Sequence, residues 1–400
     1  MTIARGLQSD AFAWLIAPMC TDIFERDFYE RALCFVPRTD PDYYAGLLSF
    51  EDLDVVLGTC NVTPSVIGLV RGNDNIPRSA FVHASGGIDP LAVAKMFDDG
   101  ATITFNQLHR YVPVLSEFCA SIGRAFSSRV QTNIYLTPPQ AQGFKPHWDT
   151  HDVFVLQVSG RKHWSVYDTK VTLPLKGQAF EPESDLPGPV AAEFDLGPGE
   201  CVYIPRGLMH SARSTTEVSL HITLGITSFT WVNFLVESVA ATALRDESLR
   251  RSLPMRFADG SIPPEALDGL VRDKLERLSS RLDPTEVWDH FRSELMVLNA
   301  PLFTDLLTSR VSTGDVTLDS KLRRRNGLFV TTKRDPERCC LCFCGSELQF
   351  PSSTWPAIAF ISVTPAFTVR DLPDCPDGEG KLTVVKRLVR EGLLQPDGHP

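Results

Sequence analysis

The chain has 400 residues, of which 43% are hydrophobic and 22% are charged. This length is too great for one hydrophobic core and predicts two or three domains of an ordinary globular protein. The net charge of −10 argues against a nucleic-acid-binding surface over the whole chain. No apolar stretch is long enough to cross a bilayer, and residues 1–10 do not predict a secretory signal, so we expect a cytoplasmic protein without membrane contact.

The N-terminal part predicts mostly short helices. The apolar residues 11–17 predict a helix that Pro18 ends, Asp22 is expected to cap a second helix through Tyr29, and Asp40 with Pro41 to open a third. Further helices are expected at 90–99 and from 112 to about 127, and strands at 66–70 and 101–108.

From the end of that last helix to about residue 229, short apolar runs alternate with glycine and proline turns. The runs predict strands at 153–158, 162–167, 193–196, 200–205 and 218–224. Such a series is typical of a double-sheet jelly roll of the cupin kind.

Three potential metal ligands fall in this region. His147 and Asp149 are two residues apart in a strand-like segment, where side chains at i and i+2 leave the same face. His210 follows an Ile-Pro-Arg-Gly turn at residues 204–207 and can complete the set. Two imidazoles and one carboxylate leave coordination positions open, as in non-heme Fe(II) oxygenases. The alternative is that all three are ordinary polar groups of loops and core.

Six segments around these ligands carry a family resemblance: 133–139, 147–149, 152–157, 160–164, 204–207 with His210, and 219–224. They resemble the JmjC/cupin ribosomal-oxygenase family, the 2-oxoglutarate-dependent hydroxylases of histidyl or arginyl residues in ribosomal proteins. The likeness extends over about residues 10–230. It implies that His147, Asp149 and His210 bind Fe(II), with 2-oxoglutarate and O2 as co-substrates and succinate and CO2 as products.

The resemblance also implies roles for three further residues. Lys162 matches the basic residue that pairs with the distal carboxylate of 2-oxoglutarate, and a buried carboxylate needs such a partner. Asn133 matches an amide near the co-substrate, and Tyr135 matches a tyrosine that contacts the target peptide. The alternatives are a solvated turn lysine and two core polar groups on a strand.

One position departs from the family. After the strand at 218–224 the relatives carry a serine that helps to hold the target side chain, but this chain has Gly225, followed by Ile226, Thr227 and Ser228. A neighbouring hydroxyl is a candidate substitute. The departure bears on the identity of the substrate more than on the chemistry.

Other polar residues near the motif have less specific expectations. His151 is expected at the rim of the site, and His163 and His221 as hydrogen-bonded core histidines. Lys145 and Asp152 could line the mouth, while Arg206 could contact substrate or form a surface ion pair.

Helical periodicity returns after the strands, at 230–252, 263–282 and 283–297. In the resembled family such a module makes the dimer interface, which implies a homodimer. The alternative is a helical bundle packed on its own barrel.

The last part, 313–400, alternates short strands and helices and resembles a winged-helix-like domain. Its cysteines at 339, 340, 342 and 344 lack the spacing of a zinc site. We expect a strand with Cys340, Cys342 and Cys344 on a buried face, with metal or redox use as the alternative. The basic run 321–325 is expected to be a solvated turn or an inter-domain ion-pair site, with little prospect of nucleic-acid contact.

These expectations combine into one hypothesis. The fold class is mainly β plus α: a catalytic double-stranded β-helix at 1–229, a helical dimerisation domain at 230–312 and a winged-helix-like domain at 313–400. The function is Fe(II)- and 2-oxoglutarate-dependent hydroxylation of an arginyl or histidyl side chain, at Cβ, in a protein or peptide. One alternative is hydroxylation of a small molecule or natural-product peptide in a biosynthetic pathway, and another is a non-catalytic cupin regulator or scaffold.

Overall fold

The computed structural model describes residues 10–59, 61–72, 74–141, 144–169, 171–260, 262–373 and 378–396. The chain divides into two compact units. The smaller unit is Phe229–Val297, and the larger one combines the chain up to Ser228 with the chain from Leu298 onward. The expected domain boundaries at residues 229 and 312 stay a prediction.

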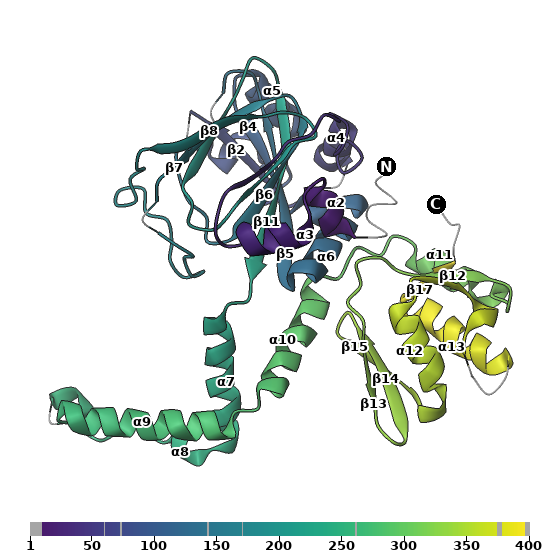
Figure 1. The fold of residues 1–400 in the computed structure, drawn as a ribbon. Helices are drawn as coiled ribbons and strands as arrows, with labels where there is room; N and C mark the ends of the chain where they lie inside the picture. Colours follow the sequence, from purple (N-terminus) through teal and green to yellow (C-terminus); the bar gives the residue numbers. More distant parts are fainter. Residues whose placement is uncertain are drawn as a thin grey trace. The chain divides into compact units, whose positions relative to one another are not determined.

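The larger unit contains two antiparallel sheets that form the jelly roll (Figure 1). The eight-stranded sheet has the order β1 (Cys34–Val36), β9 (Cys201–Ile204), β6 (Asp152–Ser159), β11 (Ser219–Ser228), β5 (Ser128–Thr137), β4 (Thr102–Asn106), β2 (Ile67–Arg71) and β3 (Asp74–Asn75). The three-stranded sheet has the order β10 (His210–Ser214), β7 (Lys162–Tyr167) and β8 (Val190–Leu196). The strands expected in this region are confirmed, with ends that differ by a few residues.

Alternation along β6 explains how the sheet acquires two apolar faces. Val153 and Val155 pack with Trp164 and Leu196 of the small sheet, in the space between the two sheets. Phe154 and Leu156, which alternate with these valines, belong to a second core on the opposite face of the sheet. A strand that is buried on both faces has no polar side to expose, which explains its continuous apolar sequence.

Helices cover that opposite face of the large sheet (Figure 1). They are α2 (Ala11–Ile16), α3 (Thr21–Asp27), α4 (Phe50–Thr59), α5 (Pro90–Asp98) and α6 (Pro113–Phe126). Asp10 caps α2 through the backbone N–H groups of Phe12 and Ala13, both at 3.0 Å.

Two details of this region differ from the sequence-based expectation. Residues 41–47 form consecutive turns, so the helix expected after Pro41 is wrong. Asp22 lies in the first turn of α3, and Cys20 occupies the N-cap without a side-chain hydrogen bond. An acidic residue in the first turn still stabilises the helix through its dipole, so Asp22 acts by charge rather than by capping.

After Leu298 the larger unit contains a further core with two small sheets. One sheet is β16 (Ala366–Thr368), β12 (Lys321–Arg324) and β17 (Leu394–Pro396), and the other is β13 (Thr331–Arg334), β14 (Arg338–Phe343) and β15 (Ser346–Pro351). The helices are α11 (Leu306–Val311), α12 (Trp355–Val363) and α13 (Gly378–Arg390). The basic run forms β12, and Arg325 is buried and paired with Asp305.

The cysteine segment is a strand, but its faces are the reverse of those expected. Cys339, Leu341 and Phe343 are buried in the core, whereas Cys340 and Cys342 lie on the partly exposed face. Leucine and phenylalanine bury more apolar area than cysteine, so their register decides which face turns inward.

The smaller unit is helical, with α7 (Trp231–Arg245), α8 (Glu247–Arg250), α9 (Pro264–Arg281) and α10 (Pro284–Leu298). Thr230 and Asn233 form a capping box at the start of α7. The helix expected at 230–252 is interrupted at Asp246, which ends α7 and caps α8. Phe234 and Phe291 stack with ring centroids 6.2 Å apart and hold α7 against α10.

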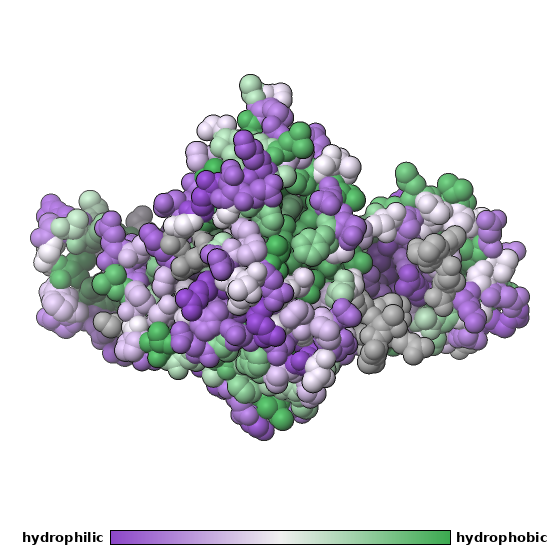
Figure 2. Space-filling view, turned by 90° about the horizontal axis from the view of Figure 1, so that it is seen from above, coloured by the Kyte–Doolittle hydropathy of each residue, from purple (hydrophilic) through white to green (hydrophobic). Residues whose placement is uncertain are grey.

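The surface view in Figure 2 shows hydrophilic residues over much of one face, with hydrophobic residues in smaller groups between them. In the described part of the chain, no helix combines the length and the apolar character that a membrane crossing needs.

Candidate metal and co-substrate site

The three predicted metal ligands converge at one end of the jelly roll. Each of His147, Asp149 and His210 offers one ligand atom, and these atoms all lie within 4.8 Å of one another. Among the described residues, this is the only group of three or more His, Cys, Asp or Glu side chains with that geometry.

Backbone hydrogen bonds outside the regular strands position the triad. His147 and His210 form an isolated antiparallel bridge, with N–O distances of 3.1 and 2.8 Å. The backbone oxygen of Asp149 accepts from Gly207 at 2.9 Å, and the positive φ of Gly207 (86°) suits the turn that leads to His210. The segment 147–149 is therefore a loop with one bridge, not the strand that the sequence suggested.

Hydrogen bonds at the far side of each imidazole prepare it for a metal ion. Nδ1 of His147 lies 2.8 Å from the carbonyl oxygen of Lys145, and Nδ1 of His210 lies 2.9 Å from that of Leu208. Each Nδ1 can donate only if it carries the proton, which leaves Nε2 as the free electron pair. Burial, together with the nearby His147, lowers the pKa of His210 to about 4, so this imidazole is neutral at pH 7.

Nε2 of His210 also lies 3.8 Å from a carboxylate oxygen of Asp149. Two imidazoles and one carboxylate are thus oriented toward a common point. This donor set fits Fe(II) with coordination positions left for other ligands.

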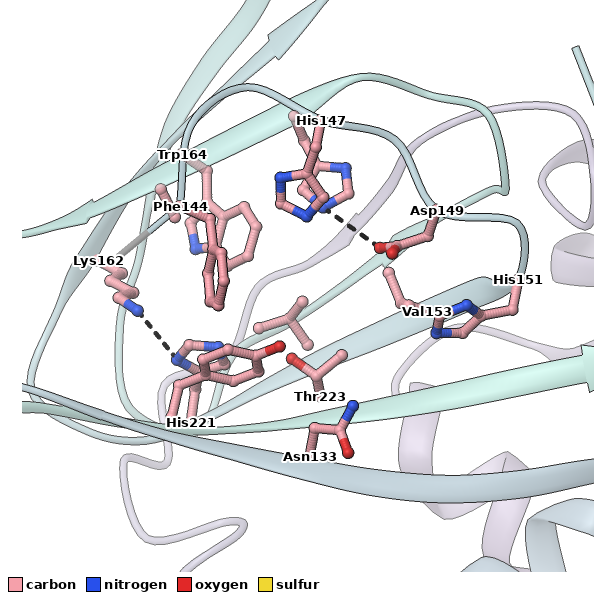
Figure 3. Close-up of a pocket in the computed structure, with 14 residues that line it drawn as sticks. Asn133, Phe144, His147, Asp149, His151, Val153, Lys162, Trp164, His221 and Thr223 are labelled. Atoms are coloured by element: carbon pink, nitrogen blue, oxygen red, sulfur yellow. Dashed lines mark hydrogen bonds and ion pairs between the residues drawn. The ribbon is translucent and has the colours of Figure 1, made fainter. Parts of the chain in front are cut away.

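A pocket extends from the triad between the two sheets (Figure 3). Its floor consists of β5 and β11, whose facing pairs are Tyr135 with His221, Asn133 with Thr223, and Gln131 with Gly225. Val153, Val155 and Phe144 contribute apolar walls.

Lys162 lies at one end of this pocket and has no anionic partner among the described residues. The side chain is buried at 3% exposure, and its only hydrogen-bond contact there is Nδ1 of His221 at 3.4 Å. Burial lowers the pKa of Lys162 to about 7. A buried ammonium group without a counter-ion is costly, so the site fits a carboxylate ligand.

Trp164 supports the same interpretation. Its Nε1 is buried without a hydrogen-bond partner, and the residue lines the pocket beside Lys162. Buried donors are rarely left unpaired, so an unsatisfied indole N–H in a pocket is a second indication of an anionic or carbonyl ligand.

His221 is buried and hydrogen-bonded, as expected, but it is also part of the pocket. Its ring stacks on Tyr135 with centroids 4.9 Å apart and planes 5° apart. Burial, with the nearby Lys162, lowers its pKa well below the usual value, whereas burial raises the pKa of Tyr135. The neutral histidine therefore contacts both residues, and Nζ of Lys162 itself lies 5.8 Å from the centre of the Tyr135 ring.

The remaining predicted residues divide between the pocket and its surroundings. Asn133 and Tyr135 line the pocket, and the Asn133 side-chain oxygen accepts from the backbone of Gln107 at 3.1 Å. His163 is not a core residue, because it points away from the pocket and pairs with Asp195 at 2.8 Å. His151 lines the pocket.

Asp152 does not line the mouth. It is fully buried and accepts hydrogen bonds from Tyr203 and from the backbone of Arg206, both at 3.0 Å. The Arg206 side chain pairs with Asp152 and Glu30, so it is neither a substrate contact nor an exposed ion pair. This buried network holds β6 next to the loop that ends at His210.

Seven of the residues that line the pocket were not expected there from the sequence: Phe144, Val153, Val155, Trp164, Ala212, His221 and Thr223. Thr223 and His221 could have been found from their period-two spacing on a strand next to the motif. Phe144 lies in a loop, where no periodicity applies.

Comparison with known proteins agrees with this geometry. Residues 107–234 match the JmjC domain family. Ribosomal oxygenase 1 of Rattus norvegicus is 36% identical over 266 residues, which cover 64% of this chain and 44% of that protein. The bifunctional lysine-specific demethylase and histidyl-hydroxylase NO66 of Drosophila sechellia is 34% identical over 60% of this chain and 38% of its own length. This chain thus spans less than half the length of these relatives.

A solved structure extends the likeness to the fold. The ribosomal oxygenase YcfD of Escherichia coli, in complex with cobalt and 2-oxoglutarate, aligns with a TM-score of 0.54 at 17% identity, over 95% of this chain and 99% of that one. Residues 107–234 therefore resemble a JmjC domain, the sequence is similar to ribosomal oxygenases over about two thirds of the chain, and the fold is similar to that of YcfD.

Proposed function

We propose that this chain is an Fe(II)- and 2-oxoglutarate-dependent dioxygenase that hydroxylates a side chain of a protein or peptide. The observation that carries the proposal is the convergence of a His-Asp-His triad and an unpaired buried lysine in one pocket. A regulator or scaffold has no need for these four groups in one place, since burying them costs stability.

Different residues of the pocket would bind the metal ion, the co-substrate and the target. Bound Fe(II) would supply the coordination positions at which 2-oxoglutarate and dioxygen meet. Overall, 2-oxoglutarate would lose CO2 and take up one oxygen atom of dioxygen to give succinate, and the other oxygen atom would enter a C–H bond of the target, so that these two compounds provide the electrons that reduce dioxygen. Lys162 and the N–H of Trp164 would hold the distal carboxylate of 2-oxoglutarate. The apolar walls would keep bulk water away from the reacting atoms. Asn133 and the Tyr135 hydroxyl would orient the co-substrate and the target.

The proposed target is a histidyl or arginyl residue of a ribosomal protein, oxidised at Cβ. The names of the relatives support this class, as does the net charge of −10, which would attract a basic partner. The test is incubation of the Fe(II)-loaded protein with 2-oxoglutarate and a mixture of ribosomal proteins, followed by peptide mass spectrometry. A peptide that gains one oxygen atom is the expected result. Oxidation of a free small molecule, with no modified peptide, would favour the biosynthetic alternative.

We further propose that the helical unit mediates a homodimer. Trp231, Leu235 and Val239 are exposed on α7 at 75%, 55% and 45%, and they share one helix face. Contiguous exposed apolar residues are typical of association surfaces, and a two-fold interface needs one self-complementary face.

Light scattering should therefore give the mass of a dimer at micromolar concentration. Leu235→Glu places a charge on this face of α7 and should shift the population toward monomer. Leu91→Glu is the matched control, because Leu91 is an exposed leucine on α5, outside the helical unit. A monomer mass for the wild-type protein would refute the dimer.

A further inference from the structure

The backbone of Gly225 and the side chain of His151 are in close contact at one end of the pocket. A Cβ atom built on Gly225 would lie 2.8 Å from Cδ2 and 2.9 Å from Nε2 of His151. Non-bonded atoms do not approach this closely without displacement. The imidazole of His151 therefore lies where any side chain at position 225 would begin.

Gly225 lies two residues beyond Thr223 on β11, in line with the pocket residues His221 and Thr223. His221, Thr223 and Gly225 alternate on the strand and face the pocket side, since two-residue steps share a face. His221 contacts Lys162 at the co-substrate end, and His151 lies at the other end, with the triad between them (Figure 3). This row of residues thus runs from the co-substrate end toward His151.

We propose that His151 is a specificity-determining residue: it contacts the target side chain in place of a residue at 225 and limits the length of side chain that the pocket admits. This inference rests on the proposed function. Gly225 allows it, because only a residue without Cβ leaves room for the ring. His151 lines the pocket, and Figure 3 marks no interaction between its ring and the other residues that line the pocket.

The chemistry of the ligand follows from the ring and from its place. A neutral imidazole offers one donor and one acceptor, so it suits a partner that also does both. Two residues along a strand span about 6.8 Å. The His151 ring, which lies next to Gly225, therefore bounds the pocket roughly that distance beyond Thr223. A short side chain with its polar group near the backbone, such as histidine, fits this space better than the long side chain of arginine.

Two small probes test the proposal without knowledge of the natural substrate: N-acetyl-histidine amide and N-acetyl-arginine amide. The protein is loaded with Mn(II) and 2-oxoglutarate, and the dissociation constant and paramagnetic broadening of each probe's Cβ protons are measured by NMR. The wild type should bind the histidine probe more tightly. His151→Ala should weaken its binding about three- to tenfold, as expected for one lost hydrogen bond, and should not weaken that of the arginine probe.

Gly225→Ala provides the second arm, because its methyl group must displace the ring. Gly225→Ala should reproduce the effect of His151→Ala on the affinity for the histidine probe. The double variant should bind this probe no more weakly than either single variant, because the two substitutions remove the same contact. His163→Ala is the matched control, a histidine outside the pocket, and should behave as wild type.

The outcomes separate the two proposals. Unchanged affinity and selectivity for the two probes in His151→Ala would overturn the role of His151. The same conclusion would follow if the probe bound the Mn(II) ion directly and its Cβ proton signals were broadened equally in all variants. Failure of the wild type to bind Mn(II) and 2-oxoglutarate would instead contradict the proposed function, and the role of His151 with it.

Discussion

His210→Ala is expected to abolish metal binding and, with it, any turnover of 2-oxoglutarate. His210 is buried, and the carbonyl oxygen of Leu208 holds its ring at 2.9 Å, so the side chain is already oriented for binding. Loss of a partner that merely orients a ligand costs about 10–100-fold in metal affinity, and loss of the ligand itself should cost more. The measurement is metal content by mass spectrometry after anaerobic loading with Fe(II) and desalting.

His163→Ala is the control for that experiment. It removes an imidazole from the neighbouring strand β7, where the side chain pairs with Asp195 rather than with the triad. This variant should retain one metal ion per chain. Wild-type metal content in His210→Ala would show that the triad does not bind the ion.

Lys162→Ala is expected to raise the 2-oxoglutarate concentration required for binding by at least about a hundredfold. Removal of one partner of a buried ion pair costs about 3–5 kcal/mol, because the other charge is left without compensation. Lys162 is buried at 3% exposure, so solvent does not screen the interaction strongly. The dissociation constant can be measured by calorimetry with the Mn(II)-loaded protein. An unchanged constant would mean that another cation holds the carboxylate.

The same lysine predicts a dependence on pH. Burial lowers the pKa of Lys162 to about 7 in the free protein, and a bound carboxylate must raise it. Below pH 7 the lysine is already charged, so its contribution to 2-oxoglutarate affinity is fully present. Above pH 7 binding must take up a proton, and the affinity should fall as pH rises. Lys162→Arg keeps the charge throughout and should lose this dependence, which calorimetry between about pH 6 and pH 9 would show.

The sequence predicted the jelly roll and the position of the metal triad, because both leave local patterns. Short apolar runs between glycine and proline turns indicate strands directly. The His-x-Asp spacing identified His147 and Asp149, although a backbone bridge to His210 aligns them rather than strand alternation. The convergence of the three side chains was predicted, but for a different physical reason, and their role as metal ligands stays a prediction.

The errors have a common cause in tertiary packing. The buried face of the cysteine strand is set by Leu341 and Phe343, whose apolar area outweighs that of the cysteines. The proximity of His151 to Gly225 joins a loop to a strand 74 positions later, and no local pattern encodes it. Contacts of that kind appear only when the chain is folded.

The most direct test of the central claim is a single turnover. The protein is loaded anaerobically with Fe(II) and 2-oxoglutarate, exposed to oxygen in the presence of ribosomal proteins, and assayed for succinate and for oxygen incorporated into peptide. We expect succinate in the wild type, formed in step with a peptide that gains one oxygen atom, and neither product in His210→Ala. Succinate formation by His210→Ala equal to that of the wild type, or none by a wild-type protein that holds its iron, would contradict the account.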